Sequence, residues 1–129
     1  MQRAIRLIAA LAVAAPLALA VAPAGAKHGN AGRVIHTGDC TGPATWKLQA
    51  KPDNGGLEVE FEVDRNRAGL SYSVVLRRNG DAFSRTTRIT AGRSGSFSLS
   101  RHTGNRAGTD RITAVATRSG ESCRASLSI

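Results

Sequence analysis

Residues 45–64 read TWKLQAKPDNGGLEVEFEVD, and polar and apolar residues alternate on both sides of the central PDNGG. Alternation with a period of two is typical of a strand with one buried face, and PDNGG has the composition of a turn. The stretch therefore predicts an antiparallel hairpin. A single register satisfies both faces, pairing Trp46 with Val63, Leu48 with Phe61, Ala50 with Val59, Lys47 with Glu62, Gln49 with Glu60 and Lys51 with Glu58. A slip by one residue would invert every side chain, so this agreement specifies the pairing.

The next two runs, LSYSVVLRR at 70–78 and DAFSRTTRIT at 81–90, are joined by Asn79-Gly80. This dipeptide favours a type I′ turn, which needs positive φ at both central residues, and so predicts a second hairpin. The hairpin would set Leu76 opposite Phe83.

The return arm of this second hairpin is less regular than its partner. Arg85 and Thr87 fall on the same parity as Phe83 and Ile89, which mixes polar and apolar residues on one face. We therefore expect the arm to be an edge strand or to contain a β-bulge.

Three further alternating runs, SGSFSLSR, DRITAVATR and SCRASLSI, follow, and the turn SGE joins the last two. None of the runs has a helical periodicity. Seven short strands separated by turn residues predict an all-β fold, an antiparallel β-sandwich.

The N-terminal segment has the composition of a Sec-type signal peptide. Arg3 and Arg6 precede an apolar run over 7–21, and small residues follow in APAGA. Cleavage after Ala26 or Ala24 fits this pattern, whereas an uncleaved anchor fits it less well because the run is short for a membrane span. We expect a cleaved signal peptide at 1–26, a flexible leader at 27–39 and one domain at 40–129, with no transmembrane segment in the mature chain.

The chain contains two cysteines, Cys40 and Cys123. Cys40 could in principle be a nucleophile, a metal ligand or half of a disulfide. An exported domain of this size has a small core and can keep a disulfide, and two cysteines allow one intramolecular pairing. We therefore predict a Cys40–Cys123 bond, worth up to roughly 4.5 kcal/mol in the chain-entropy relation.

The run DRITAVA, residues 110–116, resembles the D-x-Y-x-C-x-A run of an immunoglobulin F strand. Ile112 stands at the tyrosine position and Ala114 at the cysteine position. The resemblance implies an Ig-like sandwich that lacks the tyrosine corner and the usual disulfide between strands B and F.

From Cys40 to Cys123 the chain also resembles small exported actinobacterial proteins of unknown function. The similarity rests on CTGPATWKL, LEVEFEVD, LRRNG and SGESCR, together with the Ala-rich N-terminal segment. It implies export to the extracellular space and the same fold, and it implies no activity.

Few residues are candidates for catalysis or metal binding. The carboxylates of Glu58, Glu60, Glu62 and Asp64 alternate along one strand. The predicted register sets Glu58 and Glu62 opposite Lys51 and Lys47, so we interpret the row as a solvated strand face. No G-x-S-x-G nucleophile elbow is present, and His28, His36 and His102 lie far apart in the sequence. We therefore expect no enzyme activity, no metal site and no cofactor.

Positive charge is the remaining feature. The chain has a formal net charge of +9, and the excess is concentrated beyond residue 64. Arginine suits carboxylate and phosphate groups, so the second hairpin is a candidate anion- or partner-binding site formed by Arg77, Arg78, Arg85 and Arg88. A compositional origin, in which high-GC codon usage favours arginine, is the alternative.

The sequence favours an exported, non-catalytic binding module. Its partner would be an anionic cell-envelope polymer or an acidic protein. Nucleic acid is not expected, since no stacking aromatics accompany the basic residues, and no small-molecule substrate is predicted. The alternative function is a small secreted ligand carrier or protein inhibitor on the same scaffold.

Overall fold

The computed structural model describes residues 32–105 and 107–129, which form eight β-strands and no helix. The strands are β1 (Val34–Asp39), β2 (Thr45–Asp53), β3 (Gly56–Asp64), β4 (Ser71–Arg78), β5 (Asp81–Ile89), β6 (Ser96–Gly104), β7 (Arg111–Arg118) and β8 (Glu121–Ser128). They build two antiparallel four-stranded sheets with the strand orders β1-β2-β3-β6 and β5-β4-β7-β8. The predicted signal peptide and residues 27–31 of the predicted leader lie outside the described residues.

The first predicted hairpin is confirmed in every pair of its register. Trp46 lies opposite Val63, Leu48 opposite Phe61 and Lys51 opposite Glu58, and the other three expected pairs form as well. At the turn, Asn54 and Gly55 have φ of 48° and 76°, the left-handed values that asparagine and glycine tolerate best. The alternating charges and the alternating core residues thus specify the same strand pairing.

The second hairpin forms, but one of its predicted pairs is wrong. Asn79 and Gly80 have φ of 49° and 90°, as the predicted turn requires. Leu76 lies opposite Ser84, because the register shifts between Leu76 and Arg77 and leaves Phe83 as an extra residue on β5. The return arm is both a bulged strand and an edge strand, which confirms the expectation of an irregular arm.

The predicted flexible leader is wrong for residues 34–39, which form β1 and pair with β2 from Val34–Ala50 to Asp39–Thr45. This strand brings the total to eight instead of the seven expected. The strand lacks an apolar alternation, since its inward positions are occupied by Val34, His36 and Gly38. Gly38 is required there because a Cβ would lie 2.5 Å from the Trp46 ring.

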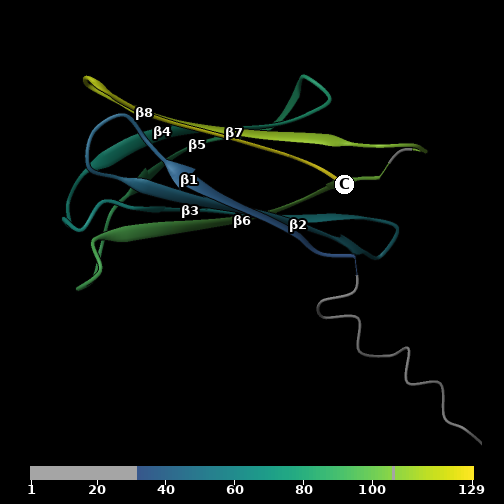
Figure 1. Ribbon diagram of the computed structural model, residues 1–129, viewed down its shortest axis with the longest axis horizontal. Helices are drawn as coiled ribbons and strands as arrows, with labels where there is room; N and C mark the ends of the chain where they lie inside the picture. Colours follow the sequence, from purple (N-terminus) through teal and green to yellow (C-terminus); the bar gives the residue numbers. More distant parts are fainter. Residues whose placement is uncertain (1–31, 106) are drawn as a thin grey trace, which may run out of the picture.

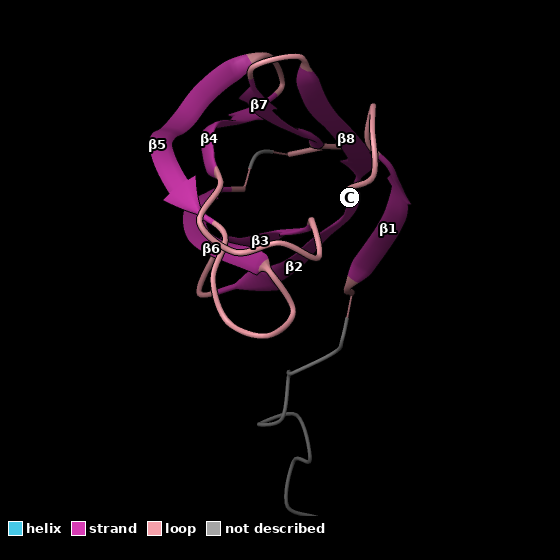
Figure 2. Cartoon of the chain, turned by 90° about the vertical axis from the view of Figure 1, so that its left-hand side faces the viewer, coloured by secondary structure: helices cyan, strands magenta, loops and turns pink. Residues whose placement is uncertain are grey.

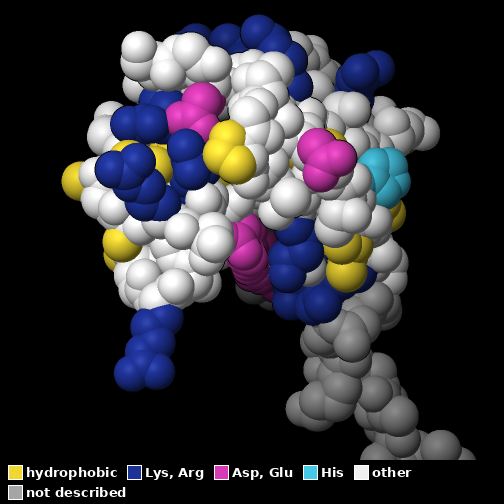
Figure 3. All heavy atoms as spheres, turned by 60° about the vertical axis from the view of Figure 1, so that its left-hand side comes forward, with side chains coloured by type: hydrophobic (Ala, Val, Ile, Leu, Met, Phe, Trp, Pro, Cys, Tyr) yellow, Lys and Arg dark blue, Asp and Glu magenta, His cyan; other side chains and the backbone are white. Residues whose placement is uncertain are grey.

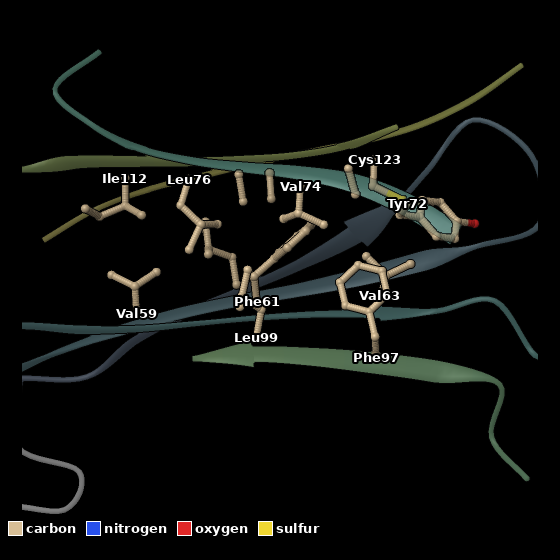
Figure 4. Packing of buried hydrophobic residues seen from close by; sticks show 14 of the residues in the cluster. Val59, Phe61, Val63, Tyr72, Val74, Leu76, Phe97, Leu99, Ile112 and Cys123 are labelled. Atoms are coloured by element: carbon tan, nitrogen blue, oxygen red, sulfur yellow. The ribbon is translucent and has the colours of Figure 1, made fainter. Parts of the chain in front are cut away.

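The two sheets pack face to face and enclose the apolar core (Figure 1). Figure 4 shows side chains from both sheets meeting in the layer between them. Phe97 contacts Phe61 edge-on, with ring centroids 6.2 Å apart, and lies 5.6 Å from the Tyr72 ring. The core is formed by the inward positions that the alternating runs predict, and the architecture is a two-sheet, sandwich-like all-β fold.

The two long sides of the sandwich differ. On one side β1 and β8 lie next to each other, and on the other β5 lies near β6 (Figure 2). The β1 side is joined by the predicted Cys40–Cys123 disulfide, whose Cα atoms are 4.3 Å apart. Beside it Thr41 donates its backbone N–H to the Ser122 carbonyl at 2.9 Å. The two sheets are therefore linked covalently along one edge.

Candidate functional site: an arginine face

The outer face of the β5-β4-β7-β8 sheet carries most of the candidate residues. On β4 the side chains of Tyr72, Val74 and Leu76 are buried, so the alternate positions, including Val75 and Arg77, point outward. On β5 the bulge at Phe83 resets the parity, and Arg85, Thr87 and Ile89 are exposed beyond it.

The bulge divides the four predicted hairpin arginines into two pairs. Arg77 and Arg85 lie on the outer face, as a shared binding site requires. Arg78 and Arg88 lie on the inner side instead. Arg78 donates a hydrogen bond from Nη1 to the Gly104 carbonyl, and Arg88 lies opposite the buried Tyr72 and is half-buried. The four residues therefore do not form one cluster.

Two arginines from outside the second hairpin, which its sequence pattern did not indicate, join the outer face. Arg111 on β7 and Arg124 on β8 are exposed and alternate with buried neighbours. The strand registers align Arg85, Val75, Val115 and Arg124 in one row across the sheet. Three strand spacings separate the ends of this row, about 14 Å. We call Arg77, Arg85, Arg111 and Arg124 the arginine face.

No carboxylate occupies an outward position on these four strands. Within residues 32–105 and 107–129, none of the four guanidinium groups of the arginine face takes part in a salt bridge. A shallow hollow of about 300 Å³ lies between Arg111 and Arg124, with Thr113, Val115 and Ser126 in its walls. Guanidinium groups with open donors around such a hollow suit oxyanions, which they bind in a bidentate manner.

The turn of the second hairpin is fixed against β7, which holds Arg77 and Arg111 on adjacent strands in position. The Asn79 side chain donates from Nδ2 to the buried Asp110 carboxylate at 2.9 Å and accepts from the Arg111 backbone N–H at 2.8 Å. The Asn79 backbone N–H donates to the Arg111 carbonyl at 2.8 Å. Because Asn79 directly follows β4 and is hydrogen-bonded to Asp110 and Arg111 at the start of β7, the spacing between β4 and β7 is set at this end of the face.

The opposite sheet presents charges that are already matched. Lys47 lies 3.8 Å from Glu62, and Lys51 lies 3.7 Å from Glu58, as the predicted cross-strand pairing implies. Glu60 accepts hydrogen bonds from Gln49 at 2.7 Å and from Ser98 at 3.3 Å. In the lower half of Figure 3 a furrow contains acidic side chains, with basic side chains along one wall. The carboxylate row is a solvated, paired face, in contrast to the arginine face.

Two other arginines are used inside the fold, near the disulfide. Arg65 donates to Glu121 Oε1 at 2.7 Å, and Arg118 donates to Glu121 Oε2 at 2.8 Å. The hydrogen bond from Arg118 is the main cause that lowers the pKa of Glu121. The Arg118 guanidinium also lies 5.8 Å from the centre of the Tyr72 ring. Burial, and then the charge of Glu121, raise the pKa of Tyr72.

The histidines lie apart, as expected from the sequence. His36 approaches the Ser126 carbonyl at 3.0 Å through Nδ1, whereas His102 approaches the Asp53 carbonyl at 2.9 Å through Nε2. His28 lies outside the described residues. Among the residues that the structure describes, no group of three or more His, Cys, Asp or Glu side chains could hold a metal ion. The same part of the chain has no helix with the length and apolarity needed to cross a bilayer.

Comparison with known proteins gives no relative for this arrangement. The chain matches no protein-family model, and neither the curated proteins nor the solved structures give a significant match. The resemblance to exported actinobacterial proteins therefore stays a prediction from sequence motifs.

Proposed function

We propose that the protein is an exported, non-catalytic binding domain that engages an anionic partner through the arginine face. One observation carries this proposal: four arginines share the outer face of one sheet, with no carboxylate among the outward positions of its strands. A compositional excess of arginine would distribute charge over both faces. Here the other face carries the carboxylates, which lie beside their own lysines.

Export is supported by the disulfide. The Cys40–Cys123 bond is consistent with an oxidising extracellular location, where such bonds persist. Outside a cell, the available partners of the arginine face include anionic envelope polymers and acidic proteins. The proposed signal peptide at 1–26 would deliver the domain there.

An Ig-like fold is part of the proposal and is supported by the strand order. With β2 to β8 lettered A, B, C, C′, E, F and G, the sheets read A-B-E and C′-C-F-G, and β1 extends the first sheet beyond strand A. The run that resembles an Ig F strand then falls on β7, the strand lettered F. The disulfide joins the connection between β1 and strand A to strand G instead of joining B to F.

Retention on an immobilised polyanion tests the proposed function. The triple variant Arg77→Gln, Arg111→Gln, Arg124→Gln should elute from heparin at a lower salt concentration than the parent, because fewer counterions are released on binding. The matched control, Lys47→Gln, Arg67→Gln, Arg93→Gln, loses the same charge elsewhere and should elute close to the parent. Equal shifts for the two triple variants would show that net charge, and not the arginine face, determines retention.

A further inference from the structure

The free edge of β5 is the second notable surface of this sheet. β5 is the outermost strand and pairs only with β4. Beyond its end, Thr90 donates its N–H to the Leu70 carbonyl and accepts from the Gly69 N–H, so the main-chain groups of Thr90 point toward β4. In an antiparallel ladder these directions alternate. The N–H and C=O groups of Arg85, Thr87 and Ile89 therefore point away from β4, along an edge that lies near β6 of the other sheet but forms no ladder with it.

This edge differs from the other edge of the same sheet. Along β8, Ser122 and Ser126 accept hydrogen bonds from Thr41 and His36, and the disulfide lies beside them. Along β5, Ile89 is 59 % exposed, the most exposed large apolar side chain of the described residues. Exposed edges with unpaired main-chain groups are templates for a further strand, and proteins commonly bind extended peptides in this way.

Charge indicates which strand would pair there. Arg85 points outward from β5, and Arg88 points inward with its Nε buried and without a hydrogen-bond partner among the described residues. A second copy of the chain would bring the same arginines to this edge, where like charges repel. An acidic strand would instead place carboxylates beside both guanidinium groups, and opposite charges across strands stabilise pairing.

We propose that the β5 edge binds an extended acidic segment of another protein by antiparallel strand addition. The register defines the segment, because its residues lie in turn opposite Ile89, Arg88, Thr87, Thr86 and Arg85. The complementary order is apolar, acidic, Thr or Ser, any residue, acidic. The prediction that the segment is acidic rests on the proposed function, whereas the prediction of strand pairing rests on the β5 edge alone.

A designed peptide tests the pairing. The acetylated, amidated peptide SVETTES carries this order, and its fluorescently labelled form should bind the purified protein saturably in an anisotropy titration. Its second, fourth and sixth residues would lie opposite Ile89, Thr87 and Arg85, with their amides facing β5. N-methylation of the fourth residue should weaken binding about tenfold or more, since a main-chain hydrogen bond is lost and the strands are forced apart. N-methylation of the fifth residue, whose amide points to solvent, should leave binding unchanged.

Two protein variants separate this proposal from the proposed function. Thr87→Pro removes an edge-facing N–H that β4 does not use, and proline is tolerated on edge strands. It should weaken peptide binding about tenfold while retaining heparin elution. The triple variant of Arg77, Arg111 and Arg124 should change heparin elution and leave peptide binding nearly intact.

Four results would overturn the strand-addition proposal. They are no saturable binding of SVETTES, equal effects of the two N-methylations, equal affinity for the charge-reversed peptide SVKTTKS, and a dimer of the protein alone that Thr87→Pro dissociates. The last result would assign the edge to a second copy. The comparison of the two N-methylated peptides tests strand addition even if Thr87→Pro fails to fold.

Discussion

Replacing both Cys40 and Cys123 by alanine should strongly destabilise the protein while leaving its fold intact. Alanine is the suitable replacement because Cys123 is fully buried in the apolar core. The disulfide closes a loop with a sequence separation of 83 residues. For a loop of this length the chain-entropy relation gives about 4.5 kcal/mol at 25 °C. Domains of this size unfold with about 5–15 kcal/mol, so the bond supplies a large share of the stability.

The effect should reside mainly in the unfolded chain. In the folded state Thr41 and Ser122 still join the same two segments, through a backbone hydrogen bond of 2.9 Å and a bond from the Ser122 N–H to the Thr41 hydroxyl at 2.8 Å. The unfolded variant is released from the loop and exposes more surface. The urea dependence of the unfolding free energy, the m-value, should therefore rise in the variant.

Urea unfolding followed by the fluorescence of the single tryptophan, Trp46, measures both quantities. The parent treated with a thiol reductant is the control and should unfold like the double-alanine variant. A variant within about 1 kcal/mol of the oxidised parent, with the same m-value, would refute loop closure as the source of stability.

Three smaller changes test the packing around the core. Glu121→Gln should lower the unfolding free energy at pH 7 by about 2 kcal/mol, because it weakens two charge-assisted hydrogen bonds. The folded-state pKa of Glu121 is depressed, so its contribution is full above the unfolded pKa and is lost as pH falls through the folded pKa. The gap between parent and variant in urea titrations should therefore begin to narrow below about pH 4.3, the ordinary pKa of glutamate, and close as the pH falls through the lower folded-state pKa; a constant gap would exclude this charge effect. Tyr72→Phe should leave the thermal midpoint nearly unchanged, since the buried hydroxyl has no partner with hydrogen-bond geometry within the described residues and only the Arg65 side chain acts on it; a clear drop would mean that the hydroxyl is bonded to Arg65. Gly38→Ala should cost about 1–3 kcal/mol in urea unfolding, because the new Cβ meets the Trp46 ring, and a silent substitution would show that the ring can move aside.

The parts of the fold that could be predicted are those in which two independent patterns constrain one pairing. The β2–β3 register follows from charges on one face and core residues on the other, so no second register satisfies both. β1 has no such pattern, because its inward positions include His36 and Gly38, and its place is set by contacts with β2 and β8. Its strand character depends on neighbours that are distant in sequence.

The arginine face shows the same limit. Arg77 and Arg85 could be selected from the sequence, since one hairpin contains both. A bulge adds one residue at Phe83 and inverts the parity of the rest of β5, which moved Arg88 to the inner side. Arg124 reaches the face only because β8 pairs with β7 and β7 with β4, and that order is set by packing between segments far apart in the chain. Charge and exposure alone do not predict such a set.

The position of the disulfide also determines how the protein responds to a mechanical load. Cys40 follows the first strand and Cys123 lies in the last, so a pulling force applied to the two ends of the domain would pass from β1 through the sulfur atoms into β8. The chain between the two cysteines, which includes β2 to β7, would carry none of the tension. Only β1 could peel from β2, and the end of β8 from β7. Attached at both ends to surfaces moving apart, the domain would lengthen only by the peeling of β1 and of the end of β8, which includes Arg124. The other three residues of the arginine face, Arg77, Arg85 and Arg111, lie between the two cysteines and would stay folded under shear.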